Sequence, residues 1–92
     1  MAIRVYFVPE EKVIIEYIDE ALKKAKYEII SDEEPYYGEI PEIKGVWATG
    51  KSLEECRRQL RETLDEWLIL SFKKNLPIPD INGIDLNFKL SA

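Results

Sequence analysis

Residues 36–56, which read YYGEIPEIKGVWATGKSLEEC, contain the strand and turn signals from which the rest of the fold is inferred. Pro41 cannot donate to a β ladder, so the aromatic run before it should end there or lie at a sheet edge. Gly45 and Gly50 bracket the short apolar run 46–49, and such glycines indicate turns with unusual backbone angles. The stretch therefore predicts two short strands that lead directly into a helix.

That helix begins at Ser52. Ser52 and Glu55 have the spacing of a capping box, in which each side chain accepts a hydrogen bond from a free amide at the helix start. Asn75 is typical of a left-handed stop, so we expect the helix to run to Lys74. Its core-facing side chains share one stripe of about 120°: Leu53, Cys56, Leu60, Leu64, Trp67, Leu68 and Ser71.

Upstream of this stretch the sequence predicts a helix and the first strand of a hairpin. Pro9 suits a first helical position, and apolar residues recur at helical spacing over residues 10–25. The β-type runs 26–30 and 36–40, joined by a polar turn, are typical of a hairpin. The run Ile3–Val8 is β-branched and aromatic, which predicts a short strand or an extended arm over the core.

Downstream, a turn at Asn82-Gly83 leads into Ile84–Leu90, where apolar and polar residues alternate strictly. This alternation predicts a half-buried strand. The expected fold class is therefore α+β: a small antiparallel sheet, made of the hairpin, the third strand and this C-terminal strand, packs on the long helix. The helix over residues 10–25 is an addition at the N-terminal side, and residues 1–92 form a single domain.

Composition excludes several classes of function. Eighteen acidic and thirteen basic side chains give a formal charge of −5, which argues against a nucleic-acid-binding surface. The absence of histidine removes Ser–His and Cys–His nucleophiles and His-rich metal sites. A lone cysteine, Cys56, cannot form an internal disulfide, and no apolar run approaches the length of a membrane helix. We expect a cytoplasmic protein without a cofactor.

The long helix is longer than the sheet that it covers. About 23 helical residues span about 34 Å, whereas a five-residue strand spans about 17 Å. Ile69 and Leu70 lie outside the apolar stripe, so the helix end needs a second packing partner, either the N-terminal helix or a second subunit. The candidate residues for an interface between subunits are Trp67, Ile69, Leu70 and Phe72.

Residues 37–56, followed after the helix by Leu76–Pro79, resemble the signature of the HicB family. The shared pattern is an aromatic-led strand, Pro-acidic-hydrophobic-x-Gly, a short strand, Gly-x-Ser-hydrophobic-Glu-Glu and a long helix. The resemblance implies a partial ribonuclease-H-like fold that self-associates. It also implies the antitoxin role of a type II toxin–antitoxin pair, in which the HicB protein neutralises HicA, a small basic ribonuclease. The segment after Pro79 is too short for the DNA-binding module of many relatives, so no direct DNA binding is expected.

Five residues are candidates for the toxin interface. Tyr36, Tyr37 and Trp47 offer the large contact area of interface anchors, although alternate residues of a sheet must face the helix. For Trp47 the core is the favoured position, and one of the two tyrosines should point outward. Glu39 and Glu42 are candidates for contact with a basic surface, and a solvated rim is the simpler interpretation of both.

The remaining polar clusters have simple structural interpretations. Glu28 with residues 32–34 resembles a metal-binding acidic cluster, but consecutive acids in a turn splay apart, so we expect no catalytic residue and no metal ligand. Cys56 is a small core residue, and Arg57, Arg58 and Arg61 form ion pairs with neighbouring glutamates on the helix surface. The leading hypothesis is a non-enzymatic antitoxin. The alternatives are an orphan oligomeric interaction module of the same family and a degenerate enzyme on a ribonuclease-H-like scaffold.

Overall fold

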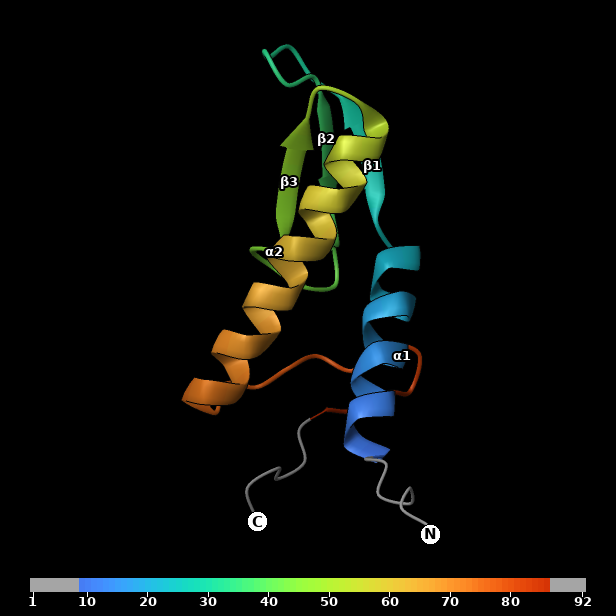
Figure 1. Cartoon of the computed structure of the whole chain (residues 1–92), viewed down its shortest axis with the longest axis vertical. Helices are drawn as coiled ribbons and strands as arrows, with labels where there is room; N and C mark the ends of the chain where they lie inside the picture. Colours follow the sequence, from blue (N-terminus) through green and yellow to red (C-terminus); the bar gives the residue numbers. More distant parts are fainter. Residues whose placement is uncertain (1–8, 87–92) are drawn as a thin grey trace, which may run out of the picture.

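Two helices and three strands make up the computed structural model of this protein, which describes residues 9–86 (Figure 1). The predicted strand or arm at Ile3–Val8 lies outside the described residues. The elements follow one another in the order α1 (Pro9–Lys23), β1 (Lys26–Ile29), β2 (Tyr36–Glu39), β3 (Trp47–Gly50) and α2 (Leu53–Lys74). The protein is therefore α+β, as the sequence predicts.

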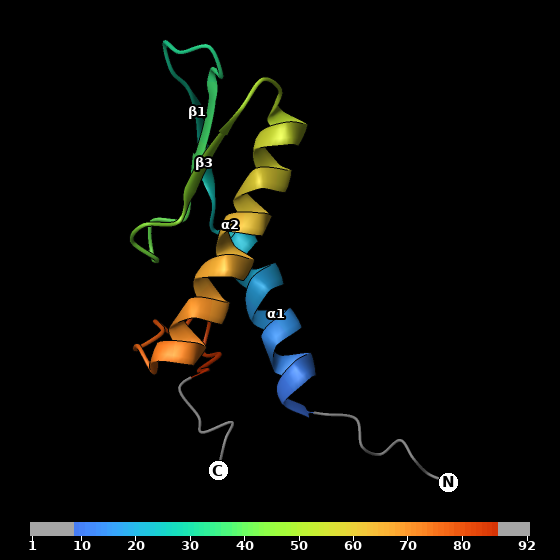
Figure 2. The ribbon, with the colours of Figure 1, turned by 60° about the vertical axis from the view of Figure 1, so that its left-hand side comes forward.

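The three strands form one antiparallel sheet in the order β1-β2-β3. In this register Glu28 lies opposite Tyr37, and Glu39 lies opposite Trp47. The predicted hairpin and third strand are thus confirmed. Helix α2 runs along one face of the sheet, and Figure 2 shows the sheet nearly edge-on with the helix on one side of it.

Both ends of α2 have the predicted caps. The Ser52 hydroxyl oxygen accepts a hydrogen bond of 3.0 Å from the Glu55 amide. The Glu55 carboxylate in turn accepts from the amide of Lys51 at 2.8 Å, one residue earlier than the usual capping box requires. At the other end Asn75 has φ 58° and its amide bonds back to the last turn, so the helix ends where the sequence predicts.

The two glycines that bracket β3 have different roles. Gly45 has φ +92°, which confirms the expected turn. Gly50 does not have a positive φ, so the expectation of an unusual backbone angle is wrong there. Its role is close contact, because a Cβ atom at Gly50 would lie 2.5 Å from the backbone nitrogen of Cys56. The missing side chain lets the start of α2 lie directly on the strand.

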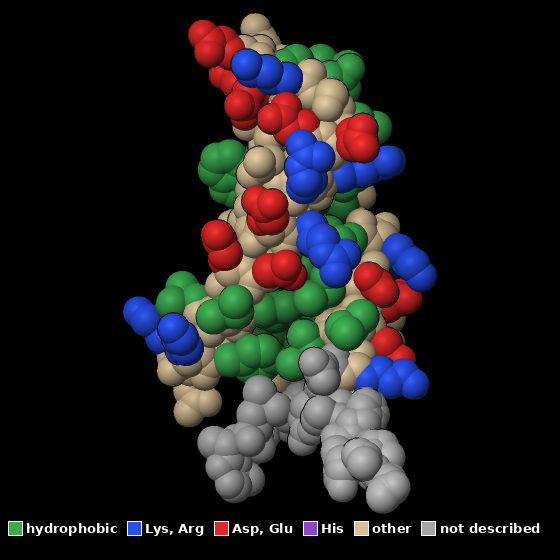
Figure 3. All heavy atoms as spheres, viewed as in Figure 1, with side chains coloured by type: hydrophobic (Ala, Val, Ile, Leu, Met, Phe, Trp, Pro, Cys, Tyr) green, Lys and Arg blue, Asp and Glu red, His purple; other side chains and the backbone are tan. Residues whose placement is uncertain are grey.

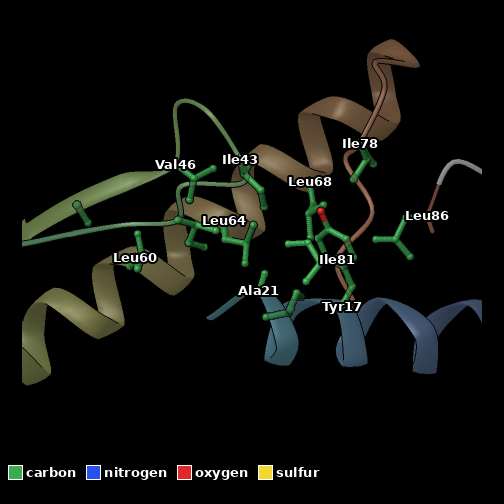
Figure 4. Packing of buried hydrophobic residues seen from close by; sticks show 13 residues of the cluster. Tyr17, Ala21, Ile43, Val46, Leu60, Leu64, Leu68, Ile78, Ile81 and Leu86 are labelled. Carbon is green, nitrogen blue, oxygen red and sulfur yellow. The ribbon is translucent and has the colours of Figure 1, made fainter. Parts of the chain in front are cut away.

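The buried stripe of α2 packs on two different partners. Its first half, with Cys56 and Leu60, faces the sheet, and both side chains are fully buried. Its second half, with Leu68, extends past the sheet and meets Tyr17 of α1 together with the segment 78–86 (Figure 4). The core side of the apolar end of α2 is therefore covered by other parts of the same chain. One of them is the N-terminal helix, which is one of the two packing partners that the sequence analysis considered.

The described part of the predicted C-terminal strand, residues 84–86, does not join the sheet. Asn82 and Gly83, with φ 51° and 82°, form the expected turn, but Ile84 makes only an isolated bridge to Ile81. Residues 84–86 belong to no strand of the sheet, and residues 87–90 lie outside the described part. The apolar side chains Ile81 and Leu86 are buried in the core cluster.

Within residues 9–86, neither helix is long and apolar enough to cross a membrane.

Candidate functional site

The face of the sheet that points away from α2 holds a group of aromatic and acidic side chains. Alternation along the strands directs Gly38, Ala48 and Gly50 toward the helix, where they are buried. The intervening residues point to the other side, which no helix of the described chain covers (Figure 2). We call this side the open face, formed by Lys26, Glu28, Tyr37, Glu39, Trp47 and Thr49.

An aromatic pair lies at the centre of the open face. The rings of Tyr37 and Trp47 stack with their centroids 6.1 Å apart and an interplanar angle of 27°. Trp47 is 54% exposed, so the prediction that it lies in the core is wrong. The physical reason is the close approach of α2 to β3, which leaves space on the helix side of that strand only for small residues, Ala48 and Gly50.

The Tyr37 hydroxyl joins this aromatic pair to a carboxylate. It donates a hydrogen bond of 3.0 Å to Oε1 of Glu39. Partial burial raises the pKa of Tyr37, and the hydrogen bond and the negative charges of Glu39 and Glu28 raise it further. The hydroxyl therefore keeps its proton at neutral pH and holds the Glu39 carboxylate beside the aromatic rings.

A third carboxylate reaches the edge of the open face from the turn between β1 and β2. The Thr49 hydroxyl donates a hydrogen bond of 2.6 Å to Oε1 of Glu34. Beside this contact lies an open hollow of about 290 Å³, bounded by Trp47 and by Gln59 of α2. The outer edge of β3 thus offers an exposed indole, a carboxylate and a polar hollow together.

The structure brings together three of the five predicted toxin-interface residues. Tyr37, Glu39 and Trp47 share the open face. Tyr36 is half-buried on the opposite side, where it pairs with Gly50. The prediction that one of the two tyrosines points outward is thus confirmed. Glu42 is exposed in the loop between β2 and β3, outside the sheet.

Four members of this site were not predicted as interface residues. Strand register brings Lys26, Glu28 and Thr49 to the open face, and Glu34 joins it through its hydrogen bond with Thr49. The sequence signal that would have found Glu28 and Thr49 is the alternation of small and large residues in β2 and β3. Small side chains at Gly38 and Ala48 mark the face that lies against the helix.

The four candidates for an interface between subunits fall into two pairs. Ile69 and Leu70 are 56% and 47% exposed, in agreement with their position outside the apolar stripe. Trp67 and Phe72 are half-buried and pack against the core cluster. Only the first pair therefore offers a freely exposed apolar surface.

The acidic residues of the β1–β2 turn do not converge. Asp32 accepts a hydrogen bond from the Glu34 amide at 3.1 Å, while the Glu34 side chain turns toward Thr49. In the described part of the chain, no three Asp, Glu, Cys or His side chains lie close enough to hold a metal ion. The single thiol, Cys56, is fully buried and donates a weak hydrogen bond to the Ala48 carbonyl oxygen at 3.6 Å. Its full burial confirms the predicted position in the core and raises the pKa of this thiol.

Two of the three arginines of α2, Arg57 and Arg61, make contacts with other elements of the chain. The Arg57 guanidinium lies over the ring of Tyr27, 5.7 Å from its centroid, and Arg61 lies 4.0 Å from a carboxylate oxygen of Asp19 on α1. These contacts cross between elements, whereas the sequence predicted pairs along the helix. A wide hollow of about 930 Å³ lies between α1, β1 and α2, and it is lined by side chains of both charges.

Comparisons with known proteins place this architecture in a family. The sequence model described as UPF0150-like matches residues 16–79, which include the whole sheet and α2. The crystal structure of TTHA0281 from Thermus thermophilus is similar, with 45% sequence identity and a TM-score of 0.77. The likeness covers 79% of this chain and 90% of that one. No curated protein matches the chain. This protein therefore belongs to the UPF0150-like family.

Proposed function

We propose that this protein is a non-enzymatic antitoxin that binds a small basic ribonuclease of the HicA kind and masks its active surface. The observation that carries the proposal is the open face, where a stacked Tyr37–Trp47 pair is exposed among carboxylates. The HicB-like pattern of residues 37–56 lies inside the segment matched by the UPF0150-like family, which is consistent with this role.

The aromatic pair has the properties of an interface anchor. Trp47 exposes more than half of its side chain, and Trp and Tyr are enriched among the residues that dominate binding energy. Its stacking on Tyr37 reduces the freedom of both rings before a partner arrives, so less conformational entropy is lost on binding. A protein that buries this pair gains apolar contact area on a rigid sheet.

The carboxylates around the pair favour a basic partner. Glu28 is exposed and Glu39 is half-buried on the open face, and Glu34 lies at its edge; Lys26 is the cationic side chain among them. One arginine of the partner is able to make two contacts at the same time: its guanidinium stacks on the indole of Trp47 and donates a hydrogen bond to the carboxylate of Glu39. The net charge of −5 adds long-range attraction to a basic ribonuclease.

The proposal includes neither catalysis nor direct DNA binding. The chain has no histidine, and the carboxylates of the open face are spread around an aromatic pair, so they suit recognition of basic groups. We also propose the cytoplasm as the compartment, where the free thiol of Cys56 stays reduced. We further propose that the fold of this protein is related to a partial ribonuclease-H-like fold.

The test is capture from an extract of the native host with this chain as tagged bait, followed by mass spectrometry. The expected result is a small basic protein in fixed stoichiometry with the bait. After separation from the bait in denaturant and refolding, this protein should cleave RNA, and readdition of the bait should stop the cleavage. A captured protein without ribonuclease activity, or one that cleaves RNA equally well when bound, would refute the proposal.

Variants of the open face test where the partner binds. Trp47→Ala and Glu39→Lys change exposed or half-buried side chains, so the fold is retained while binding falls by at least about tenfold. Glu16→Lys is the matched control, since it makes the same change of charge at an exposed position of α1. Equal loss of binding in Glu39→Lys and Glu16→Lys, with unchanged binding in Trp47→Ala, would indicate nonspecific charge attraction.

A second candidate function is that of an orphan oligomeric module of the same family without a toxin partner. The exposed apolar pair Ile69–Leu70 favours this alternative, because such a pair promotes association. Recovery of the bait alone as a homo-oligomer would support the orphan module over the antitoxin.

A further inference from the structure

The outer edge of β3 carries backbone groups that the sheet leaves unpaired. In an antiparallel pair, residues that exchange hydrogen bonds alternate with residues whose N–H and C=O groups point away from the neighbouring strand. The Ile40 amide donates to the Val46 carbonyl oxygen at 3.1 Å, so Ala48, two residues further along, also bonds toward β2. The backbone groups of Trp47 and Thr49 therefore point outward.

These outward groups have no hydrogen-bond partner in the described part of the chain. β3 is an outer strand of the sheet, and no other strand lies beyond it in residues 9–86 (Figure 1). The next outward amide, that of Lys51, donates to the carboxylate of Glu55 at 2.8 Å, which closes this end of the edge. The N–H and C=O groups of Trp47 and Thr49 thus form a short template that an added strand is able to pair.

The strand itself contains no residue that prevents such pairing. Many sheet edges are protected by proline, by lysine side chains or by a bulge. β3 has the sequence Trp-Ala-Thr-Gly, and its register with β2 is continuous. Its four residues limit an added strand to a short one.

The hollow beside this edge is acidic. The hollow of about 290 Å³ is lined by the carboxylates of Glu34 and Glu55 and, among the described residues, by no basic side chain. One oxygen of each carboxylate is held by the chain itself, through the Thr49 hydroxyl and the Lys51 amide, which leaves the other oxygen for a partner. Figure 3 shows acidic side chains spaced along the side of the molecule where β3 forms the sheet edge. An extended segment with basic side chains therefore fits this edge in backbone geometry and in charge.

The opposite edge of the sheet lacks this charge preference. On β1, the Ile30 amide donates to the Pro35 carbonyl oxygen at 2.8 Å, so Tyr27 and Ile29 are the residues whose backbone groups point outward. The hollow that adjoins Tyr27 is lined by side chains of both charges, and the Arg57 guanidinium lies over the Tyr27 ring. A basic segment is therefore expected at β3 and not at β1.

We infer that a basic partner adds an extended strand to the outer edge of β3. Alternation then divides the side chains of the added strand between two sides of the sheet. Those opposite Trp47 and Thr49 lie on the open face, close to the carboxylate of Glu34. The side chain opposite Ala48 lies on the helix side, where Gln59 of α2 lines the hollow. This mode of binding deepens the proposed function and rests on it for the identity of the partner.

A peptide probe tests the edge without any ribonuclease. The probe is a blocked hexapeptide of alternating arginine and valine, titrated to about 5 mM against the whole chain and followed by NMR of the backbone amides. Hydrogen exchange at Trp47 and Thr49 should slow by at least about tenfold, because their amides gain a partner. Exchange at Ala48 should change little, since its amide is already bonded to β2.

Two further peptides separate charge from backbone pairing. A hexapeptide with glutamate in place of arginine should bind at least about tenfold more weakly than the arginine peptide, since it faces Glu34 and Glu55. The arginine peptide with every backbone amide N-methylated keeps its charges but donates no backbone hydrogen bond. It should also bind at least about tenfold more weakly.

Proline at position 49 tests the same groups from the side of the protein. Thr49→Pro removes an outward N–H without the loss of a ladder bond, and sheets accept proline at such edge positions. Thr49→Val is the reference, because it also lacks the hydroxyl that bonds Glu34 but keeps the amide. Ile29→Pro makes the same change on the outer edge of β1 and is the matched control. Binding of the arginine peptide should fall by at least about tenfold in Thr49→Pro relative to Thr49→Val and stay unchanged in Ile29→Pro, with circular dichroism as the check of folding.

Three results would overturn the inference. The first is unchanged exchange at Trp47 and Thr49 with the arginine peptide at its highest concentration, and the second is equal binding of the N-methylated peptide. The third is protection of Tyr27 and Ile29 instead, which would move the binding to β1. A wild type that self-associates without peptide, and that becomes monomeric in Thr49→Pro, would assign the edge to a second copy of the chain.

The same measurement on a captured complex distinguishes this inference from the proposed function. If a ribonuclease is captured and silenced while the Trp47 and Thr49 amides still exchange as in the unbound protein, the antitoxin role stands and strand addition is refuted. If the arginine peptide protects these amides but no ribonuclease is captured, strand addition stands and the antitoxin role is refuted.

Discussion

The hydroxyl of Tyr17 on α1 donates a hydrogen bond of 2.5 Å to the backbone carbonyl oxygen of Pro79, 62 positions later in the chain. Tyr17 is fully buried, and its ring packs in the core beside Leu68 and Ile81 (Figure 4). This bond joins the N-terminal helix to the segment that follows α2. Both of these elements cover the half of α2 that extends past the sheet.

Replacement of Tyr17 by phenylalanine tests this link. Tyr17→Phe retains the ring but leaves the Pro79 carbonyl without its donor, so the free energy of unfolding should fall by about 1–2 kcal/mol. Denaturant titration measures the change. Tyr37→Phe is the control, because its hydroxyl bonds the half-buried carboxylate of Glu39 on the open face and its loss should cost less. An unchanged free energy of unfolding in Tyr17→Phe would mean that the Tyr17 bond adds nothing to stability.

The same hydroxyl should make stability depend on pH in the alkaline range. Burial, with the negative charge of Asp80, raises the pKa of Tyr17 from 10.0 to about 12. The folded state therefore holds this proton more tightly than the unfolded chain does. Its contribution to stability is complete below pH 10 and is lost as the pH rises toward 12. In Tyr17→Phe the fall of the unfolding free energy over this window should be shallower than in the wild type, and parallel curves would contradict the prediction.

Gly50 and Gly38 should respond differently to alanine. A Cβ atom at Gly50 meets the backbone of Cys56 at 2.5 Å, whereas at Gly38 the nearest atoms, at 2.6 and 2.8 Å, belong to the ring of Tyr27. A side chain is able to rotate away, but the start of α2 must shift as a whole. Gly50→Ala should therefore cost about 3 kcal/mol or more, and Gly38→Ala clearly less. Thermal unfolding of both variants measures the order, and the reverse order would contradict this account of the contact.

Asn75 should tolerate glycine but not alanine. Its φ of 58° lies in the left-handed region, which glycine adopts freely and alanine does not. Asn75→Ala should lower the free energy of unfolding by about 1 kcal/mol, while Asn75→Gly should be neutral or slightly stabilising. Chemical denaturation of both variants checks the sign. A loss of stability with glycine equal to that with alanine would show that the Asn75 side chain, and not its backbone angle, determines stability at this position.

The thiol of Cys56 should react with disulfide reagents only when the protein opens. The side chain is fully buried, and burial raises its pKa, so both access and the thiolate fraction are low. Labelling of the native protein should be slower by orders of magnitude than labelling in denaturant. A second thiol, introduced as Ser31→Cys at an exposed turn position, is the internal control and should react at once. Fast labelling of Cys56 in the native state would indicate that the start of α2 opens readily.

Local signals predicted the parts of the fold that depend on neighbours in sequence. The cap at Ser52, the stop at Asn75 and the turn at Asn82-Gly83 were all correct, because each depends on backbone geometry within a few residues. Five of the seven residues of the predicted stripe of α2 are buried, and Leu53 and Trp67 are half-buried, since the spacing of the stripe is a property of the helix alone. One prediction that depends on distant contacts was wrong, namely the core position of Trp47.

The sequence by itself determined the helices, the hairpin, the third strand and the charge balance, because periodicity and turn chemistry act over short distances. Only the tertiary structure decided which face of the sheet stays open. Alternation divides a strand into two faces but does not state which is buried. The close contact of Gly50 with the start of α2 decides this, since it forces Ala48 inward and Trp47 outward beside Tyr37. The candidate binding surface exists because the helix lies on the small residues of β3 and leaves Trp47 exposed on the other face.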